Sequence, residues 1–387
     1  MSLAASASSL RANLLRHSLL PAIIAFGLLQ PAYPVIKVTG EPPIWRLEPL
    51  ARIVSPDGVG FTQIGSVLLD PRGGLLIVDR KEQVIYRYDD GGKMLGTIGR
   101  VGSGPSEFRV PYALGWLGDE LMVFDPENAR ILRWTREAKY LGQITLMSRA
   151  AGVTPVFPSA DGQVWLRQSG RGPSGNRQQN FTRFPGTGRG DTIWLPYNPP
   201  TRSPKVPTGG NGFVVCNIGG TTTEFGSPFR EPMAHRVVSG QSELVEINSV
   251  GYQLAVMKSS GDTIRVLEHV VAPVPISEAE WQMGLKDYKE WSAENPAATC
   301  TGRFIRPVAK PAIRDLATDD GGRVWVERYM RTGFQWEAWQ GDKIVGAFAM
   351  PDSASNLNTA FGGDRVAFVR YREEDGGSEV RLYRIRR

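Results

Sequence analysis

Gly74-Leu-Leu-Ile-Val-Asp79 begins a pattern that recurs along the chain. A short turn follows it, and then come Val84-Ile-Tyr-Arg-Tyr88 and Leu95-Gly-Thr-Ile98. The same order returns, 46 residues later, in Leu121-Met-Val-Phe-Asp125, Arg130-Ile-Leu-Arg-Trp134 and Tyr140-Leu-Gly-Gln-Ile144. These runs are short, rich in β-branched and aromatic residues, and separated by polar turns, so each of them predicts a β-strand.

A further apolar run precedes each unit, at Ile64–Leu69 and at Tyr112–Trp116, which makes four strands per unit. Repeated units of this length with four strands are typical of the blades of a β-propeller. Fainter copies of the second strand follow in Asp161-Gly-Gln-Val-Trp-Leu166, Glu243-Leu-Val-Glu-Ile247, Gly322-Arg-Val-Trp-Val326 and Asp364-Arg-Val-Ala-Phe-Val369. Six copies predict an all-β fold, a six-bladed β-propeller with four-stranded antiparallel blades, over residues 44–387.

The flanking segments of this region predict how the ring closes. Trp45–Val54 precedes the first full blade, and Val380–Ile385 is the last strand of the pattern. We expect the N-terminal strand to complete the last blade beside Val380–Ile385, because this pairing leaves no sheet edge open for aggregation.

Two stretches interrupt the pattern. Residues 169–212 are dense in Gly, Pro, Ser, Asn and Arg, which is typical of a long surface loop. Residues 276–306 begin with the capping box Ser277-Glu-Ala-Glu280. Four large apolar residues then share one helical face: Trp281, Leu285, Tyr288 and Trp291. We expect one amphipathic helix, ended by Asn295-Pro296, that packs on a face of the propeller, either as plain structural packing or as a lid over a ligand.

Residues 1–32 have the composition of a targeting segment. Arg11 and Arg16 supply positive charge, and Leu19–Leu29 is an apolar stretch too short to span a bilayer comfortably. We interpret 1–32 as a signal peptide cleaved near Ala32, with an uncleaved N-terminal anchor as the alternative. The predicted location is periplasmic or extracellular.

Charge and cysteines narrow the functional classes. The formal net charge of +6 is small for 387 residues and scattered along the chain, so no nucleic-acid partner is expected. The two cysteines, Cys216 and Cys300, would meet oxidising conditions after export. A disulfide between them and two free thiols both stay open, because the sequence does not give the distance between their Cα atoms.

The stretch Ile98–Pro111, followed by Leu121-Met-Val-Phe-Asp-Pro-Glu-Asn-Ala-Arg-Ile-Leu132, resembles the NHL repeat. More broadly, the chain is similar to exported bacterial six-bladed propellers of NHL type, in which a Pro-Val-Pro segment and a helix interrupt the ring, as Pro273–Pro275 and the predicted helix do here. Ser106 departs from the repeat, which usually has Gly there. Most members of that group have no assigned function, so the resemblance implies a fold rather than an activity.

The repeat residues have an architectural explanation. Gly102 is expected to bend the chain between blades, and Phe108 to pack the crossover. Asp125, Asn128 and Arg130 can hydrogen-bond the turn that follows their strand. Arg100, Glu107 and Arg109 flank the same crossover, as a solvated surface or, alternatively, as a charged rim for an anionic ligand.

No catalytic, cofactor-binding or metal-binding residue can be assigned from the sequence. The histidines are His17, His235 and His269, and His17 lies in the targeting segment, so a three-histidine metal site is excluded. His235 is expected at the start of the fourth blade, in a turn or facing a ligand, and His269 in a strand. No Gly-x-Ser-x-Gly elbow occurs. Arg189-Gly-Asp191 and Asn180-Phe-Thr182 are short triplets that are common by chance.

The sequence therefore predicts a monomeric, exported NHL-like propeller that binds or scaffolds an extracytoplasmic protein, peptide or glycan without a cofactor. Propellers generally bind ligands where loops from several blades converge. The alternative is an extracellular calcium-dependent hydrolase or lyase of the propeller type, with calcium held by carboxylates in the channel.

Overall fold

The computed structural model describes residues 33–111, 113–145, 156–158, 163–171, 177–185, 191–194, 212–230, 235–238, 243–248, 251–258, 262–351, 355–372 and 376–387. The chain divides into the units Met1–Ala32 and Tyr33–Arg387. The predicted signal peptide lies outside the described residues, and the second unit carries the whole fold discussed below.

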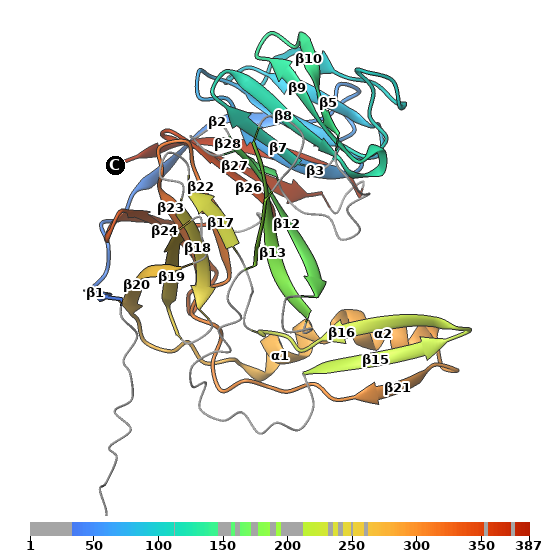
Figure 1. Ribbon diagram of the computed structural model, residues 1–387. Helices are drawn as coiled ribbons and strands as arrows, with labels where there is room; N and C mark the ends of the chain where they lie inside the picture. The colour runs from blue at the N-terminus through green and yellow to red at the C-terminus, as the bar shows by residue number, and fades with distance from the viewer. Residues whose placement is uncertain are drawn as a thin grey trace, which may run out of the picture. The chain divides into compact units, whose positions relative to one another are not determined.

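The second unit contains six antiparallel blades (Figure 1). Blade one has β3 (Ile64–Leu69), β4 (Leu75–Asp79), β5 (Val84–Tyr88) and β6 (Met94–Ile98); blade two has β7 (Ala113–Leu117), β8 (Glu120–Asp125), β9 (Arg130–Thr135) and β10 (Tyr140–Thr145). Blade three has β11 (Val156–Pro158), β12 (Gln163–Arg171), β13 (Arg177–Pro185) and β14 (Asp191–Trp194); blade four has β17 (His235–Val238), β18 (Glu243–Asn248), β19 (Gln253–Lys258) and β20 (Thr263–Val270). Blade five has β22 (Asp315–Thr318), β23 (Val324–Tyr329), β24 (Phe334–Gln340) and β25 (Lys343–Ala349); blade six has β26 (Ser355–Gly362), β27 (Arg365–Tyr371) and β28 (Ser378–Arg386).

The first strands of the blades close a ring. β3 contacts β7, β7 contacts β11, β11 contacts β17, β17 contacts β22, β22 contacts β26, and β26 contacts β3 again. The predicted six-bladed β-propeller is therefore confirmed.

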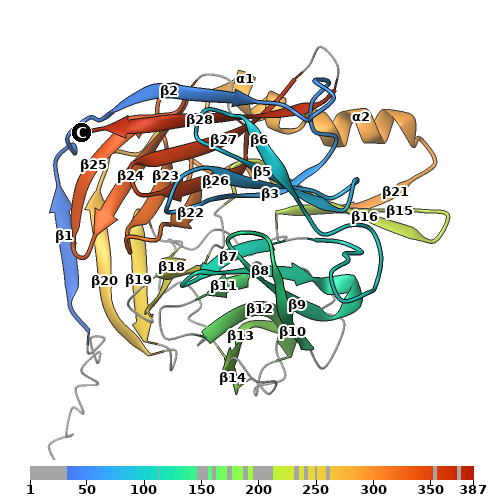
Figure 2. The same ribbon diagram turned by 90° about the horizontal axis from the view of Figure 1, so that it is seen from above.

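The N-terminal strand β2 (Arg46–Ile53) completes blade six, as predicted. It pairs antiparallel with β28, with Ile53 opposite Val380 and Arg46 opposite Arg386, and the two strands run side by side in Figure 2. A second N-terminal strand, β1 (Val35–Thr39), was not foreseen. It pairs in parallel with β20 and so extends blade four. Residues 40–45 therefore connect a strand of blade four, β1, to a strand of blade six, β2.

The core fills the spaces between neighbouring blades. Between blades five and six, the rings of Trp325 and Phe361 stack with centroids 4.2 Å apart. Between blades four and five, Leu254 of β19 and Val326 of β23 belong to one buried cluster. Large aromatic and branched side chains suit these layers because each blade must bury both of its faces.

The first predicted insertion differs from the expected loop. Within residues 169–212, β12 continues to Arg171 and β13 and β14 complete blade three. The sequence of β13 is polar and lacks a clear apolar alternation, so local composition favoured a loop, whereas pairing with β12 makes it a strand.

The topology defines which side of the ring carries the long connections. In an antiparallel blade, the turn between the second and third strands lies on the same side as the connection to the next blade. We call this side the crossover face. It carries the turns after β4, β8, β18 and β23, and the connections from β6 to β7 and from β20 to β22.

Candidate ligand-binding cleft

A cleft of about 360 Å³ lies on the crossover face between blades four and five. Six of its lining residues supply most of the chemistry: Tyr252, His269, Pro273, Lys310, Arg328 and Tyr329. They come from the turn before β19, the end of β20, the connection to β22 and the end of β23. We call this space the interblade cleft.

Two proline-rich segments form the outer wall of the interblade cleft. Pro275 and Ala309 form an isolated antiparallel bridge, and the Lys310 N–H donates to the Val274 carbonyl at 2.8 Å. Pro273 and Pro311 flank this pairing and fix their own backbone φ angles. The chain therefore leaves blade four and returns to blade five through a narrow paired neck, with residues 276–306 looped out beyond it.

A buried polar cluster forms the inner end of the cleft. His269 Nδ1 lies 3.0 Å from a carboxylate oxygen of Glu337, and Nε2 lies 2.9 Å from the carbonyl oxygen of Gly40. A carboxylate and a carbonyl can only accept, so both ring nitrogens donate and the ring is an imidazolium. Burial alone lowers the pKa of His269, but the hydrogen bond and charge of Glu337 and the Gly40 carbonyl outweigh it and raise this pKa above 6.5.

Arg328 shares the same carboxylate. Its Nε lies 2.7 Å from Glu337, and its terminal nitrogen donates to Glu41 at 2.7 Å. His269 and Arg328 together carry two positive charges against the single buried charge of Glu337. Glu41, whose side chain is 70% exposed, supplies the balancing negative charge.

Tyr252 closes the cluster from the side of blade four. Its hydroxyl accepts a hydrogen bond from the indole N–H of Trp339 at 3.0 Å, and its ring meets His269 edge-on with centroids 5.1 Å apart. Burial, followed by the negative charge of Glu337, raises the pKa of Tyr252 well above 10. The hydroxyl therefore stays neutral at ordinary pH.

Lys310 places a second buried cation in the cleft wall. Its side chain is 4% exposed, and its Nζ lies 2.5 Å from Glu280, whose side chain is 38% exposed. The ammonium also lies 5.7 Å and 6.0 Å from the ring centroids of Tyr329 and Phe229. The hydrogen bond from Lys310, followed by that from the Ser277 backbone N–H, lowers the pKa of Glu280 to about 2.

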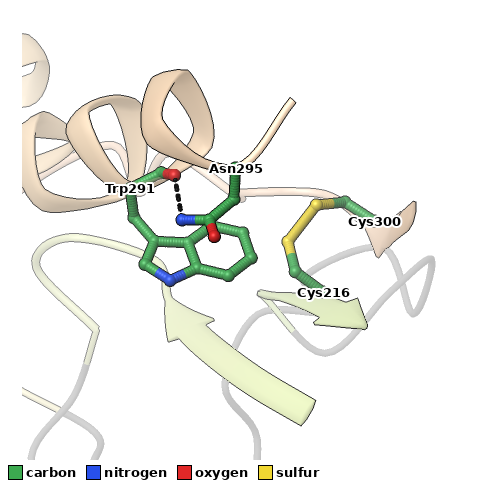
Figure 3. The surroundings of a disulfide bond; sticks show 4 residues. All are labelled: Cys216, Trp291, Asn295 and Cys300. Atoms are coloured by element: carbon green, nitrogen blue, oxygen red, sulfur yellow. Dashed lines mark hydrogen bonds between the residues drawn. A yellow bond between two sulfur atoms is a disulfide. The ribbon is translucent and has the colours of Figure 1, made fainter. Parts of the chain in front are cut away.

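The looped-out residues 276–306 join residues 213–226, from the connection between blades three and four, in a small disulfide-bridged unit. β15 (Phe213–Ile218) pairs with β16 (Thr221–Gly226) and with β21 (Thr299–Gly302), next to α1 (Glu278–Gly284) and α2 (Lys286–Glu294). Cys216 and Cys300 are directly opposite in the β15–β21 pairing and form a disulfide, as Figure 3 shows beside Trp291 and Asn295 of α2's C-terminal end. We call this unit the bridged insert.

The helices of the bridged insert differ from the prediction in two ways. The capping box at Ser277 is confirmed, but the single expected helix is two short ones, broken at Leu285. Tyr288 and Trp291 pack on Phe225 of β16, each with ring centroids 5.3 Å apart, rather than on a blade. A partner strand inside the insert, which the sequence pattern did not reveal, therefore receives the apolar helix face.

The NHL-like residues are structural, as expected, but Asp125 and Arg130 bind the crossover before blade two rather than the turn after their own strand. Asp125 accepts hydrogen bonds from the backbone N–H groups of Arg109 and Val110 at 3.3 and 3.1 Å. Arg130 donates to the carbonyls of Ser103 and Glu107, so it fastens the same crossover. These residues do not line the interblade cleft.

The remaining predicted positions divide between structure and surface. Arg100 forms an exposed ion pair with Glu107 at 3.0 Å, away from the cleft lining. His235 begins β17, but its side chain is outside the described part of the chain. Of the Arg189-Gly-Asp191 triplet, Asp191 alone belongs to the described residues. Asn180-Phe-Thr182 lies within β13. In the described ranges, no group of three or more His, Cys, Asp and Glu side chains could hold a metal ion.

Sequence reasoning missed the charged residues of the cleft. Of them, the sequence singled out His269 alone, and only as a strand residue. The best available signal was the pair of proline segments, Pro273-Val-Pro275 and Pro307-Val-Ala-Lys-Pro311, which the Pro275–Ala309 bridge joins in the neck.

No protein family matches the sequence, and no curated protein is similar to it by sequence. The fold is similar to that of a DUF4221 family member from Bacteroides vulgatus, with a TM-score of 0.50 and 10% identity over 89% of this chain and 99% of that one. A putative exported protein from Bacteroides fragilis gives a TM-score of 0.46 and 11% identity over 91% and 100%. A catalytically inactive virginiamycin B lyase from Staphylococcus aureus gives 0.44 and 14% over 87% and 99%.

These similarities concern the fold alone. A propeller fold by itself does not select between binding and catalysis. Among the described residues, no helix is both long and apolar enough to cross a membrane.

Proposed function

We propose that this chain is an exported binding protein whose ligand, an extracytoplasmic protein, peptide or glycan, occupies the interblade cleft. The observation that carries this proposal is the combination of a cleft on the crossover face with apolar proline and aromatic walls and a few converging charged groups. Such concave, mostly apolar surfaces with few polar groups are typical of ligand sites.

The chemistry of the cleft favours binding over catalysis. A general base needs a free lone pair, but both nitrogens of His269 donate to fixed acceptors. The hydroxyl of Tyr252 has a raised pKa and does not ionise readily. The polar cluster is therefore better suited to hold the walls of the cleft and the chain around Gly40 in place.

Export is supported by two independent features. The leader-like composition of residues 1–32 is typical of a signal peptide. The Cys216–Cys300 disulfide is of the kind that persists in oxidising compartments such as the periplasm. Cell fractionation with sequencing of the mature N-terminus tests this part, and an intact Met1 in the cytosol would contradict it.

The binding proposal is tested by capture from an extract of the native cell envelope. Ala272 is an exposed lining residue of the cleft, so Ala272→Trp should fill the entrance without disturbing the core. Ala293, exposed on α2 and outside the cleft lining, gives the matched control Ala293→Trp. A species captured by wild type and the control, but lost with Ala272→Trp, supports the cleft; equal capture by all three proteins overturns it.

A further inference from the structure

We infer that the interblade cleft selects a ligand that carries a carboxylate group, which binds Lys310 by taking the place of Glu280. This inference rests on the proposed function and adds to it the chemistry of the ligand. It follows from how the two cations of the cleft are neutralised.

A buried cation needs a counter-ion at all times, because an uncompensated charge in a low-dielectric environment is costly. The Lys310 side chain is 4% exposed, so its ammonium cannot turn to solvent. Its counter-ion Glu280 lies at the surface and can regain full hydration when it moves away. Exchange of one carboxylate for another therefore leaves Lys310 satisfied, while Glu280 exchanges its hydrogen bonds to Lys310 and Ser277 for bonds to water.

Arg328 repeats this arrangement within the same cleft. The pair His269 and Arg328 exceeds the buried charge of Glu337 by one, and the excess is balanced by the mostly exposed Glu41. Two buried cations of one cleft are thus each completed by a surface glutamate. The acidic side chain among the lining residues of the cleft, Glu268, is paired with Lys37 at 3.0 Å and with Gln253 at 2.9 Å.

The rest of the cleft suits an apolar body attached to the carboxylate. The lining includes three prolines and two aromatic rings: Pro273, Pro307, Pro311, Phe229 and Tyr329. Flat apolar surfaces of this kind pack against a pyranose ring or against aliphatic and proline side chains. A uronic-acid sugar and the C-terminus of a peptide share the required chemistry.

The matched probes are acetyl-trialanine as the free acid and as the amide, and the galacturonic acid trimer with the neutral galactose trimer. Their affinities are measured by calorimetry on the mature protein with its disulfide intact. In at least one pair, the acid should bind better than its neutral partner, and the preferred pair identifies the ligand source as peptide or sugar.

Three variants separate the inference from a general effect on folding. Lys310→Met keeps the aliphatic stem and should weaken binding of the acid about tenfold or more, because a charged hydrogen bond is lost. Glu280→Gln should strengthen it about threefold, since it removes the competing carboxylate but keeps a residue that completes the capping box. Glu278→Gln, on the same helix turn and paired with Arg306, should leave affinity unchanged.

Equal affinities for acid and neutral probes, or unchanged acid binding in both Lys310→Met and Glu280→Gln, would overturn the inference. If Ala272→Trp still abolishes capture from the envelope extract in that case, the cleft remains the binding site and only the carboxylate assignment fails. If Ala272→Trp has no effect, the cleft itself is refuted.

Discussion

His269 joins three separate parts of the chain through its two ring nitrogens. The residue belongs to β20, its Nδ1 donates to Glu337 on β24, and its Nε2 donates to Gly40, which follows β1. One protonated ring therefore ties blade four to blade five and to the N-terminal segment. Loss of its proton breaks the hydrogen bond to one of these two acceptors.

This geometry predicts a pH-dependent stability. The pKa of His269 is raised in the folded state above 6.5, so its stabilisation is fully present below the unfolded value and is lost as pH rises through the folded pKa. We expect His269→Gln to lower the melting temperature most at about pH 6, with a smaller difference from wild type at alkaline pH. Melting curves that stay parallel over this range would contradict the assignment of charge.

Some of these residues could be predicted from the sequence and others could not. The structural role of Asp125 and Arg130 was predictable because they belong to a repeated local pattern, but their partners lie in the crossover before blade two rather than in the predicted turn. Glu337 is 68 residues from His269, and Lys310 is 30 residues from Glu280. Each lies in a segment that reads locally as an ordinary strand or loop, so only the packing of blades four and five reveals the pairing.

Gly346 shows the same dependence on distant packing. A Cβ atom at this position would lie 1.9 Å from Trp45, a buried ring just before β2. Gly346→Ala should therefore lower the free energy of unfolding by about 2–3 kcal/mol, because the ring or the β25 backbone must shift. Urea unfolding measures this change.

Gly118→Ala is the control for Gly346→Ala. Gly118 has a positive φ of 58° but no atom within 4 Å of an added Cβ, so only the backbone cost of about 1 kcal/mol is expected. If the two variants were equally stable, Trp45 would not be held against blade five as the structure places it.

At the scale of elements, the bridged insert shows which features of a helix the sequence pattern predicts and which it does not. The capping box and the spacing of Trp281, Tyr288 and Trp291 predicted the helical content, because these signals are local. They did not predict the break at Leu285, where the backbone turns at φ −92° and ψ 0°. The adjacent Gly284 packs on Pro228, where a Cβ would lie 2.6 Å from the proline ring, so a contact 56 residues away shapes the helix.

The disulfide is the covalent link within this insert. It closes a loop with a sequence separation of 84 residues that contains all of blade four. Cys300→Ser should lower the free energy of unfolding by about 2–4 kcal/mol, since the unfolded chain is no longer constrained. We expect limited proteolysis to cut α2 before the blades in this variant; cleavage as slow as in the oxidised wild type would show that packing on Phe225 suffices.

At the scale of the whole molecule, arginines at one repeated position connect consecutive blades. Arg323 precedes β23 of blade five and donates to the carbonyl of Gly363 in blade six. Arg365 begins β27 of blade six and donates to the carbonyls of Gly74 and Asp70 in blade one. Both follow a glycine-containing turn, and each links its blade to the next one on the side opposite the crossover face. Blade six is thus bound to blade one by side chains as well as by the contact of β26 with β3.

We therefore expect Arg365 to contribute more to the free energy of unfolding than an exposed arginine in one ion pair. Its side chain is 7% exposed and also pairs with Asp90 of blade one, so Arg365→Met removes a charged donor from two carbonyls and a carboxylate. We expect a loss of about 2–4 kcal/mol in the free energy of unfolding. Arg386, 56% exposed and paired with Glu48 across the β2–β28 closure, is the control, and Arg386→Met should cost less than about 1 kcal/mol. Equal losses in the two variants would mean that the ring is held by β2 pairing alone, whereas the predicted difference assigns part of its closure to the arginine between blades six and one.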